Sequence, residues 1–253
     1  SANGGATTSA AGGSGVYLGG DFTTVNGATQ MRVASVNPTT GARNAAFTGS
    51  LDARPRASAV SPDGTRYVIG GTFQVVNGAT QPAIASLDPV TGATRPWAAT
   101  GMVPRALVGG GCDSEVSDIV IAGTRAYVVA EGLEPGCFEG EYVANLNDGS
   151  VVWDIQCLGA SQSVAVIGNY SYRGSHMHDC GRTPGGFTGP RVSAEFIWYR
   201  LSANSISDGA FVHWSPNTNG AGTDHVGPHA MATDGTQLFV AGDFSSVGGS
   251  AQQ

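Results

Sequence analysis

The sequence predicts an all-β protein, a β-propeller of four-stranded antiparallel blades. The first observation is a repeat: VYLGGDFTTVNGATQMRVASVNPTTG at 16–41 recurs as YVIGGTFQVVNGATQPAIASLDPVTG at 67–92, which is 51 residues further on. A third copy, LFVAGDFSSVGGSAQQ, follows at 238–253. The second observation is that the apolar runs are short, rich in β-branched and aromatic residues, and separated by Gly, Pro, Asn and Asp. Four such runs in each ~50-residue repeat are typical of a propeller blade.

Each repeat divides into four expected strands, A to D. Strand A is an apolar run ending at a tight turn, and we expect it within 57–66, 117–125, 163–169 and 229–237, with 6–11 as the candidate in the first repeat. Strand B carries the paired glycines, which let neighbouring backbone approach closely inside a sheet. We expect strand C within 31–36, 83–87, 142–146 and 196–201, and strand D within 44–47, 93–97, 151–155 and 210–214. Asn37-Pro38 with Gly41 presets a tight C–D hairpin.

Five repeat units are visible, and we expect them to form a single domain over 1–253. The approximate blades are 1–52, 53–101, 106–157, 158–220 and an incomplete 221–253. The last copy stops before its C and D strands, while the first already has B, C and D. We therefore expect the chain to be a segment of a larger propeller, completed by a continuation or a partner chain, because an unclosed ring exposes sheet edges.

The GGDFTTVNG…ASVNPTTG and GGTFQVVNG…ASLDPVTG segments resemble the kelch-like blades of secreted bacterial β-propeller repeat proteins. The likeness extends to a subgroup with a histidine-rich stretch similar to 175–180 (SHMHDC) and a WxPNTN-like segment at 214–219. The resemblance covers nearly the whole chain and implies the propeller fold, but no particular activity. The regular Tyr and Trp partners of true kelch repeats are missing, so nothing about kelch ligands carries over.

The four cysteines occupy equivalent places in two successive blades. Cys112 precedes strand A of the third blade and Cys137 follows its strand B, while Cys157 and Cys180 do the same in the fourth. The start of A and the end of B share one rim, so we expect the pairs Cys112–Cys137 and Cys157–Cys180. A zinc site of all four thiolates is disfavoured because no CxxC spacing exists. Disulfides indicate an oxidising compartment, hence a secreted or cell-surface protein.

Composition excludes several classes of function. The formal net charge is −7 and all 12 basic residues are arginines. The charge provides no basic field for a phosphate backbone, so we expect no nucleic-acid binding. No apolar run approaches the ~18–20 residues of a membrane span, and we expect no membrane insertion. No GxSxG, HExxH, P-loop or dinucleotide motif occurs. These absences favour a binding protein over an enzyme without deciding between them.

The long, irregular loops all fall on the face of the propeller that carries the B–C and D–A connections. They are 134–140, 176–191 and 215–229, and four of the five histidines lie there. Long loops on a rigid scaffold are where binding usually resides. The candidate ligand-binding residues are His176, His178, Asp179, Asp224, His225 and His229.

His176 and His178 point to the same side of an extended strand, so both can meet one ligand. With His229 they form a candidate site for a divalent metal, either calcium or a transition metal. The alternative is that the imidazoles hydrogen-bond loop carbonyls and hold these segments in shape. His213 and the four tryptophans are interpreted as structural, the tryptophans packing blade against blade.

Three functions follow from this reading. The first is a secreted or cell-surface recognition module that binds a glycan or a protein through its loop-rich face. The second is a metal-dependent extracellular enzyme, a lyase or hydrolase, that uses His176, His178, His225 and His229. The third is a structural subunit of a surface assembly. The sequence leaves the cofactor, if any, unidentified.

Overall fold

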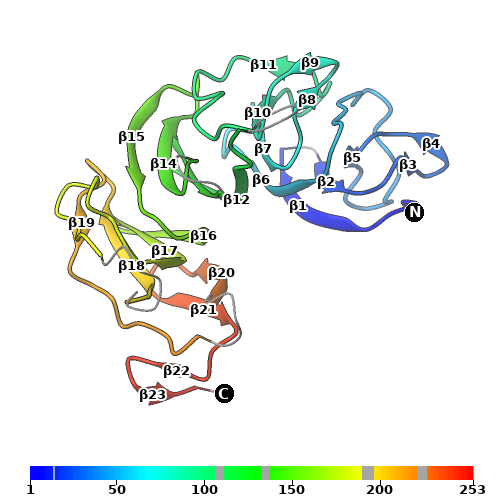
Figure 1. The fold of residues 1–253 in the computed structure, drawn as a ribbon. Coiled ribbons are helices and arrows are strands. Elements are labelled where there is room, and N and C mark those ends of the chain that lie inside the picture. Colours follow the sequence, from blue (N-terminus) through cyan, green and yellow to red (C-terminus); the bar gives the residue numbers. More distant parts are fainter. Residues whose placement is uncertain (14, 106–110, 133–136, 190–196, 221–226, 253) are drawn as a thin grey trace. The chain divides into compact units, whose positions relative to one another are not determined.

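The computed structural model describes residues 1–13, 15–105, 111–132, 137–189, 197–220 and 227–252 (Figure 1). In these ranges the regular structure consists of β-strands, and no helix has the length and apolar character that a membrane crossing requires. The chain divides into two compact units. One comprises Ser1–Ala126, Gly132–Phe138 and Ala144–Val151; the other comprises Tyr127–Glu131, Glu139–Val143 and Val152–Gln253.

The strands form successive antiparallel sheets, the blades of a β-propeller. Blade 1 contains β1 (Ala6–Gly12), β2 (Gly15–Gly20) and β5 (Val33–Val36). Blade 2 contains β6 (Pro55–Val60), β7 (Tyr67–Gly71), β10 (Ile84–Leu87) and β11 (Thr94–Arg95). Blade 3 contains β12 (Glu115–Ala122), β13 (Arg125–Glu131), β14 (Gly140–Asn145) and β15 (Val151–Gln156). Blade 4 contains β16 (Ser161–Ile167), β17 (Tyr170–Met177), β18 (Tyr199–Ser205) and β19 (Phe211–Val212). In blade 5, β20 (Pro228–Thr233) pairs with β21 (Leu238–Gly242).

Three small hairpins occupy the B–C loops of blades 1, 2 and 5. They are β3 (Thr24–Val25) with β4 (Ala28–Thr29), β8 (Val75–Val76) with β9 (Ala79–Thr80), and β22 (Ser246–Val247) with β23 (Ser250–Ala251). In the first, Asn26 and Gly27 both adopt positive φ, 49° and 79°, which a two-residue turn between twisted strands requires. The VNG string of the repeat is therefore the turn of a hairpin inside the B–C loop, a feature that the four-strand division of the repeat does not include.

Strand D of blade 1 differs from the expectation. Residues 44–47 were expected to form it, but blade 1 is a three-stranded sheet, and only an isolated bridge joins Val36 to Arg43. Asn44 accepts a hydrogen bond from the Ala46 N–H at 3.2 Å through its side chain, and its carbonyl accepts one from the Phe47 N–H at 3.2 Å. This turn directs Phe47 into the core instead of along the sheet.

In blades 1 and 2, the first glycine of the paired motif makes room for strand A of the following blade. A Cβ built on Gly19 would lie closer than 3.0 Å to Pro55, and one on Gly70 would do the same with Val116. A Cβ built on Gly174, in strand B of blade 4, would likewise lie closer than 3.0 Å to Pro228 of β20. The repeated glycine is therefore a packing requirement between successive blades, as well as the close approach within a sheet that the sequence predicted.

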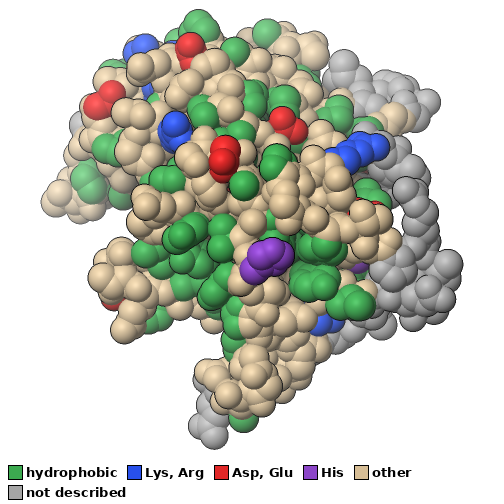
Figure 2. Space-filling view, turned by 90° about the vertical axis from the view of Figure 1, so that its left-hand side faces the viewer, with side chains coloured by type: hydrophobic (Ala, Val, Ile, Leu, Met, Phe, Trp, Pro, Cys, Tyr) green, Lys and Arg blue, Asp and Glu red, His purple; other side chains and the backbone are tan. Residues whose placement is uncertain are grey.

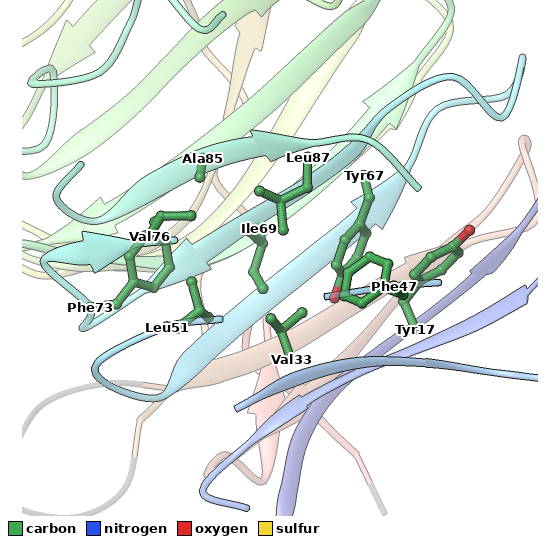
Figure 3. Packing of buried hydrophobic residues seen from close by; sticks show 10 residues of the cluster. All are labelled: Tyr17, Val33, Phe47, Leu51, Tyr67, Ile69, Phe73, Val76, Ala85 and Leu87. Carbon is green, nitrogen blue, oxygen red and sulfur yellow. The ribbon is translucent and has the colours of Figure 1, made fainter. Parts of the chain in front are cut away.

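The main hydrophobic cluster of the first unit lies between blades 1 and 2 (Figure 3). Tyr17 stacks on Tyr67 with ring centroids 4.7 Å apart, and Phe47 meets Tyr17 edge-on at 6.0 Å. Val33, Ile69 and Leu87 fill the layer beside these rings. Blades thus adhere through alternating apolar residues of facing sheets, as expected for a repeat protein in which each unit packs on its neighbours.

Candidate functional site

The two disulfides are Cys112–Cys137 and Cys157–Cys180, which confirms the pairing predicted from the repeat. In blade 4, Cys157 precedes β16 and Cys180 follows β17. The Leu158 N–H donates to the Asp179 carbonyl at 2.7 Å, and the His178 N–H donates to the Leu158 carbonyl at 2.9 Å. These bonds and the disulfide extend the A–B ladder beyond the regular strands and fix the start of the long loop after β17.

His176 and His178 gather around one indole on this rim. Both imidazoles meet Trp198 edge-to-face, with ring centroids 5.6 Å and 5.2 Å away. Their common side follows from the alternation of side chains along β17 and its extension. Burial lowers the pKa of His178 below its usual value, which favours the neutral imidazole at pH 7.

The Nε2 atom of His176 accepts a hydrogen bond from the Ala160 N–H at 3.2 Å. This bond joins the end of strand B to the start of strand A. It is the structural role that the sequence offered as the alternative to metal binding. Asp179 also stabilises backbone, because its Oδ1 accepts the Gly181 N–H at 2.8 Å. Both side chains are thus fixed in position by the loop they brace.

His229 lies at the start of β20, the strand A that packs against β16 and β17 of blade 4. Its Nε2 is 3.2 Å from Oδ2 of Asp243, which follows strand B of the same blade. This His–Asp pair is exposed on the rim of blade 5. Asp224 and His225, the other predicted site residues, lie outside the described residues.

The structure does not assemble the predicted metal set within the ranges it describes. There, no group of three or more His, Cys, Asp or Glu side chains is placed to hold a metal ion. His229 is paired with Asp243, and Nε2 of His176 already accepts a backbone N–H. A metal site formed by His176, His178 and His229 therefore stays a prediction without support from this geometry.

A groove that was not predicted from the sequence runs along the outer strand of blade 4. It has a volume of about 380 Å³ and is lined by Gly185, Gly186, Phe187, Tyr199, Phe211, His213, Trp214 and Ser215. Two features of the sequence could have indicated this groove. They are the Gly-Gly-Phe segment at 185–187 and the aromatic residues Phe211 and Trp214, which lie three positions apart. His213 and Trp214, which the sequence led us to interpret as structural, both line this groove, and Trp214 also packs on Tyr172.

Residues 178–189, the described part of the long loop after β17, build one wall of this groove. The Cys180 N–H donates to the Phe187 carbonyl at 2.7 Å, and the Phe211 N–H donates to the Pro184 carbonyl at 2.8 Å. The loop thereby turns back over the free edge of β19. Phe187 is wedged between Tyr199, at a centroid distance of 4.3 Å, and Phe211, at 5.6 Å. The three rings cover the Cys157–Cys180 disulfide and Met177 beneath them.

The tryptophans divide between packing and surface. Trp97 and Trp153 are buried, and the Trp153 indole N–H donates to the Ile206 carbonyl at 3.0 Å, which agrees with their structural interpretation. Trp198 and Trp214 are only partly buried. Trp198 stands between the histidines of the rim, and Trp214 lines the groove.

No protein-family model and no curated protein matches this sequence. Solved structures do match. The computationally designed Ika8 protein has a TM-score of 0.55 at 15% identity, over 94% of this chain and 56% of that one. The quinohemoprotein alcohol dehydrogenase ADHIIG from Pseudomonas putida HK5 has a TM-score of 0.49 at 11% identity, over 90% and 36%. The β-propeller domain of Cps50 (Swd1) from Myceliophteria thermophila has a TM-score of 0.42 at 10% identity, over 94% and 73%.

This chain thus spans 56% of the length of the designed protein. At identities this low, structural similarity shows the fold alone, and function has to be argued from the site.

Proposed function

We propose that this chain is a secreted or cell-surface recognition module that binds a glycan or a protein through the loop-rich rim of blade 4. The observation that carries the proposal is the construction of this rim. A disulfide and a backbone ladder hold the long loop after β17, and the His176–Trp198–His178 group and the aromatic groove are built on it. Such rigid support for exposed aromatic and polar groups is typical of binding sites.

The scarcity of charged side chains supports a partner that is recognised mainly by shape and hydrogen bonding. Charged side chains make up 12% of the sequence, and on the face drawn in Figure 2 they are few and separated. The two disulfides and the resemblance to secreted kelch-like repeat proteins support an extracellular setting, where thiols oxidise.

The test is a binding screen of the disulfide-intact chain against a printed glycan array and a panel of bacterial and host surface-protein ectodomains. We expect a binder whose affinity falls at least tenfold in Trp198→Ala or Trp214→Ala. The matched control is Tyr170→Ala, which removes an exposed ring at the opposite end of β17. Absence of any binder from both panels, or equal losses in all three variants, contradicts the proposal.

A further inference from the structure

We infer that the groove along the outer strand of blade 4 is a binding site for a neutral carbohydrate chain; this inference rests on the proposed recognition function and names its ligand class. The groove is distinct from the histidine group of the rim. It lies between the returning loop at 185–187 and the segment from Phe211 to Ser215. Its volume of about 380 Å³ falls in the range of small-ligand sites, roughly 300–1,000 Å³.

The walls of the groove offer aromatic rings held in place before any ligand arrives. Trp214 packs edge-to-face on Tyr172, with centroids 5.0 Å apart and an interplanar angle of 82°. Phe187 is fixed between Tyr199 and Phe211 above the disulfide. Because these rings are already ordered by packing, binding costs little side-chain entropy, which is the usual advantage of aromatic anchors.

Polar groups alternate with the rings. His213 and Ser215 are exposed, and Tyr199, which contributes a hydroxyl group, is partly buried. The lining contains no Asp, Glu, Lys or Arg side chain among the residues that the structure describes. A phosphate, a carboxylate or a guanidinium would therefore lose hydration in this groove without gaining a counter-charge.

A sugar ring matches both features of the lining. Its C–H faces can lie on aromatic rings, while its hydroxyl edges exchange hydrogen bonds with neutral donors and acceptors. An aromatic cage for a quaternary ammonium fits less well, because Phe187 and Tyr199 pack against each other at 4.3 Å instead of enclosing a space. Because the groove is partly open to solvent, the ends of a longer ligand can leave it, and we therefore take the ligand to be a chain.

The experiment titrates cellohexaose, xylohexaose, mannohexaose, laminarihexaose and maltohexaose into the intact chain by calorimetry, with decaproline as the peptide probe. We expect one or more of the oligosaccharides to bind, and the affinity to fall at least tenfold in Trp214→Ala and at least threefold in His213→Ala. Tyr170→Ala should bind as the wild type does, and Trp198→Ala tests whether the histidine group of the rim binds the sugar instead of the groove. Melting curves establish that each variant is folded, and a second Trp214 variant, Trp214→Phe, should retain most of the affinity through its ring.

Each other outcome overturns the inference in an identifiable way. If an oligosaccharide binds but only Trp198→Ala weakens it, the groove is not the site, while the recognition function stands. If decaproline binds with sensitivity to Trp214→Ala and no sugar does, the groove recognises a protein segment and the carbohydrate class is wrong. If no probe binds to a folded wild type at millimolar concentration, the inference fails, and the array and ectodomain screen then decides the recognition function separately.

Discussion

The carboxylate of Glu141 on β14 and the guanidinium of Arg173 on β17 interact electrostatically with both side chains fully buried. Arg173 also donates to Sγ of Cys157 at 3.3 Å, so the pair lies beside the disulfide of blade 4. Burial raises the pKa of Glu141 to about 7, although the positive charge of Arg173 and the Ser171 hydroxyl act in the opposite direction. Desolvation of the carboxylate thus outweighs its pairing.

This pair predicts an unusual pH dependence of stability. A carboxyl group whose pKa is higher in the folded than in the unfolded chain stabilises fully below its unfolded pKa, and that contribution is lost as pH rises through about 7. Relative to Glu141→Gln, the wild type should lose on the order of 3 kcal/mol of unfolding free energy between pH 4.5 and pH 8. Urea unfolding of both proteins at several pH values measures this. Every other titratable group is common to both proteins, so its contribution cancels; parallel curves would contradict the prediction.

The disulfide of blade 4 should control the order of the long loop beside it. In Cys157→Ala/Cys180→Ala we expect the chain to lose about 3 kcal/mol of stability and trypsin to cut rapidly after the exposed Arg182. The reason is that the loop begins at the end of the hydrogen-bonded ladder that this disulfide closes. Without the disulfide, the end of the ladder can open locally and expose the loop to the protease. Cys112→Ala/Cys137→Ala is the matched control, with a similar global loss but slow cleavage at Arg182. Equal cleavage rates in the two double variants would count against the proposed bracing.

One side chain position anchors the B–C hairpin in three blades. Oδ1 of Asp52 accepts the N–H groups of Gln74 and Val75, each at 2.9 Å. The same role falls to Asn3 in blade 1 and to Asn219 in blade 5.

The repeat therefore contains its own control for this anchor. Asp52→Asn should be nearly neutral, within about 0.5 kcal/mol, because asparagine performs this role elsewhere in the chain. Asp52→Ala should cost about 1–2 kcal/mol by leaving two N–H groups without their acceptor. Thermal unfolding of the two variants provides the measurement, and a destabilisation by Asp52→Asn as large as that by Asp52→Ala would show that charge, not acceptor geometry, matters.

Gly70 should be intolerant of even a methyl group. A Cβ added at this position would overlap the side chain of Val116 in β12, which is fully buried. Gly70→Ala should cost about 1–3 kcal/mol through overpacking. Gly5→Ala is the comparison, because nothing lies within 4 Å of its added carbon. Chemical denaturation that gives the same midpoint for both variants would refute this account of the repeated glycine.

Local features of the sequence determined most of the fold. The strand pattern, the glycine pairs and the C–D turns are short-range signals, and Asn37 shows why. Its side chain accepts the N–H groups of Thr39 and Thr40, both at 2.9 Å, so the turn is specified by neighbouring residues alone. The disulfide pairing was equally accessible, because a repeat at fixed spacing assigns equivalent positions to equivalent places in successive blades.

The tertiary structure decided which aromatic rings come together at the surface of blade 4. Phe187, Tyr199 and Phe211 come from a loop and two strands, and only the return of that loop over β19 brings their rings together. Phe47 in blade 1 was also placed by tertiary packing. It is buried against Tyr17, and the segment around it does not extend as the expected strand D. Such contacts depend on packing between residues distant in sequence, which periodicity and turn propensity do not encode. The sequence by itself determined where most of the strands and turns lie, whereas burial decided which aromatic residues became core and which became a groove.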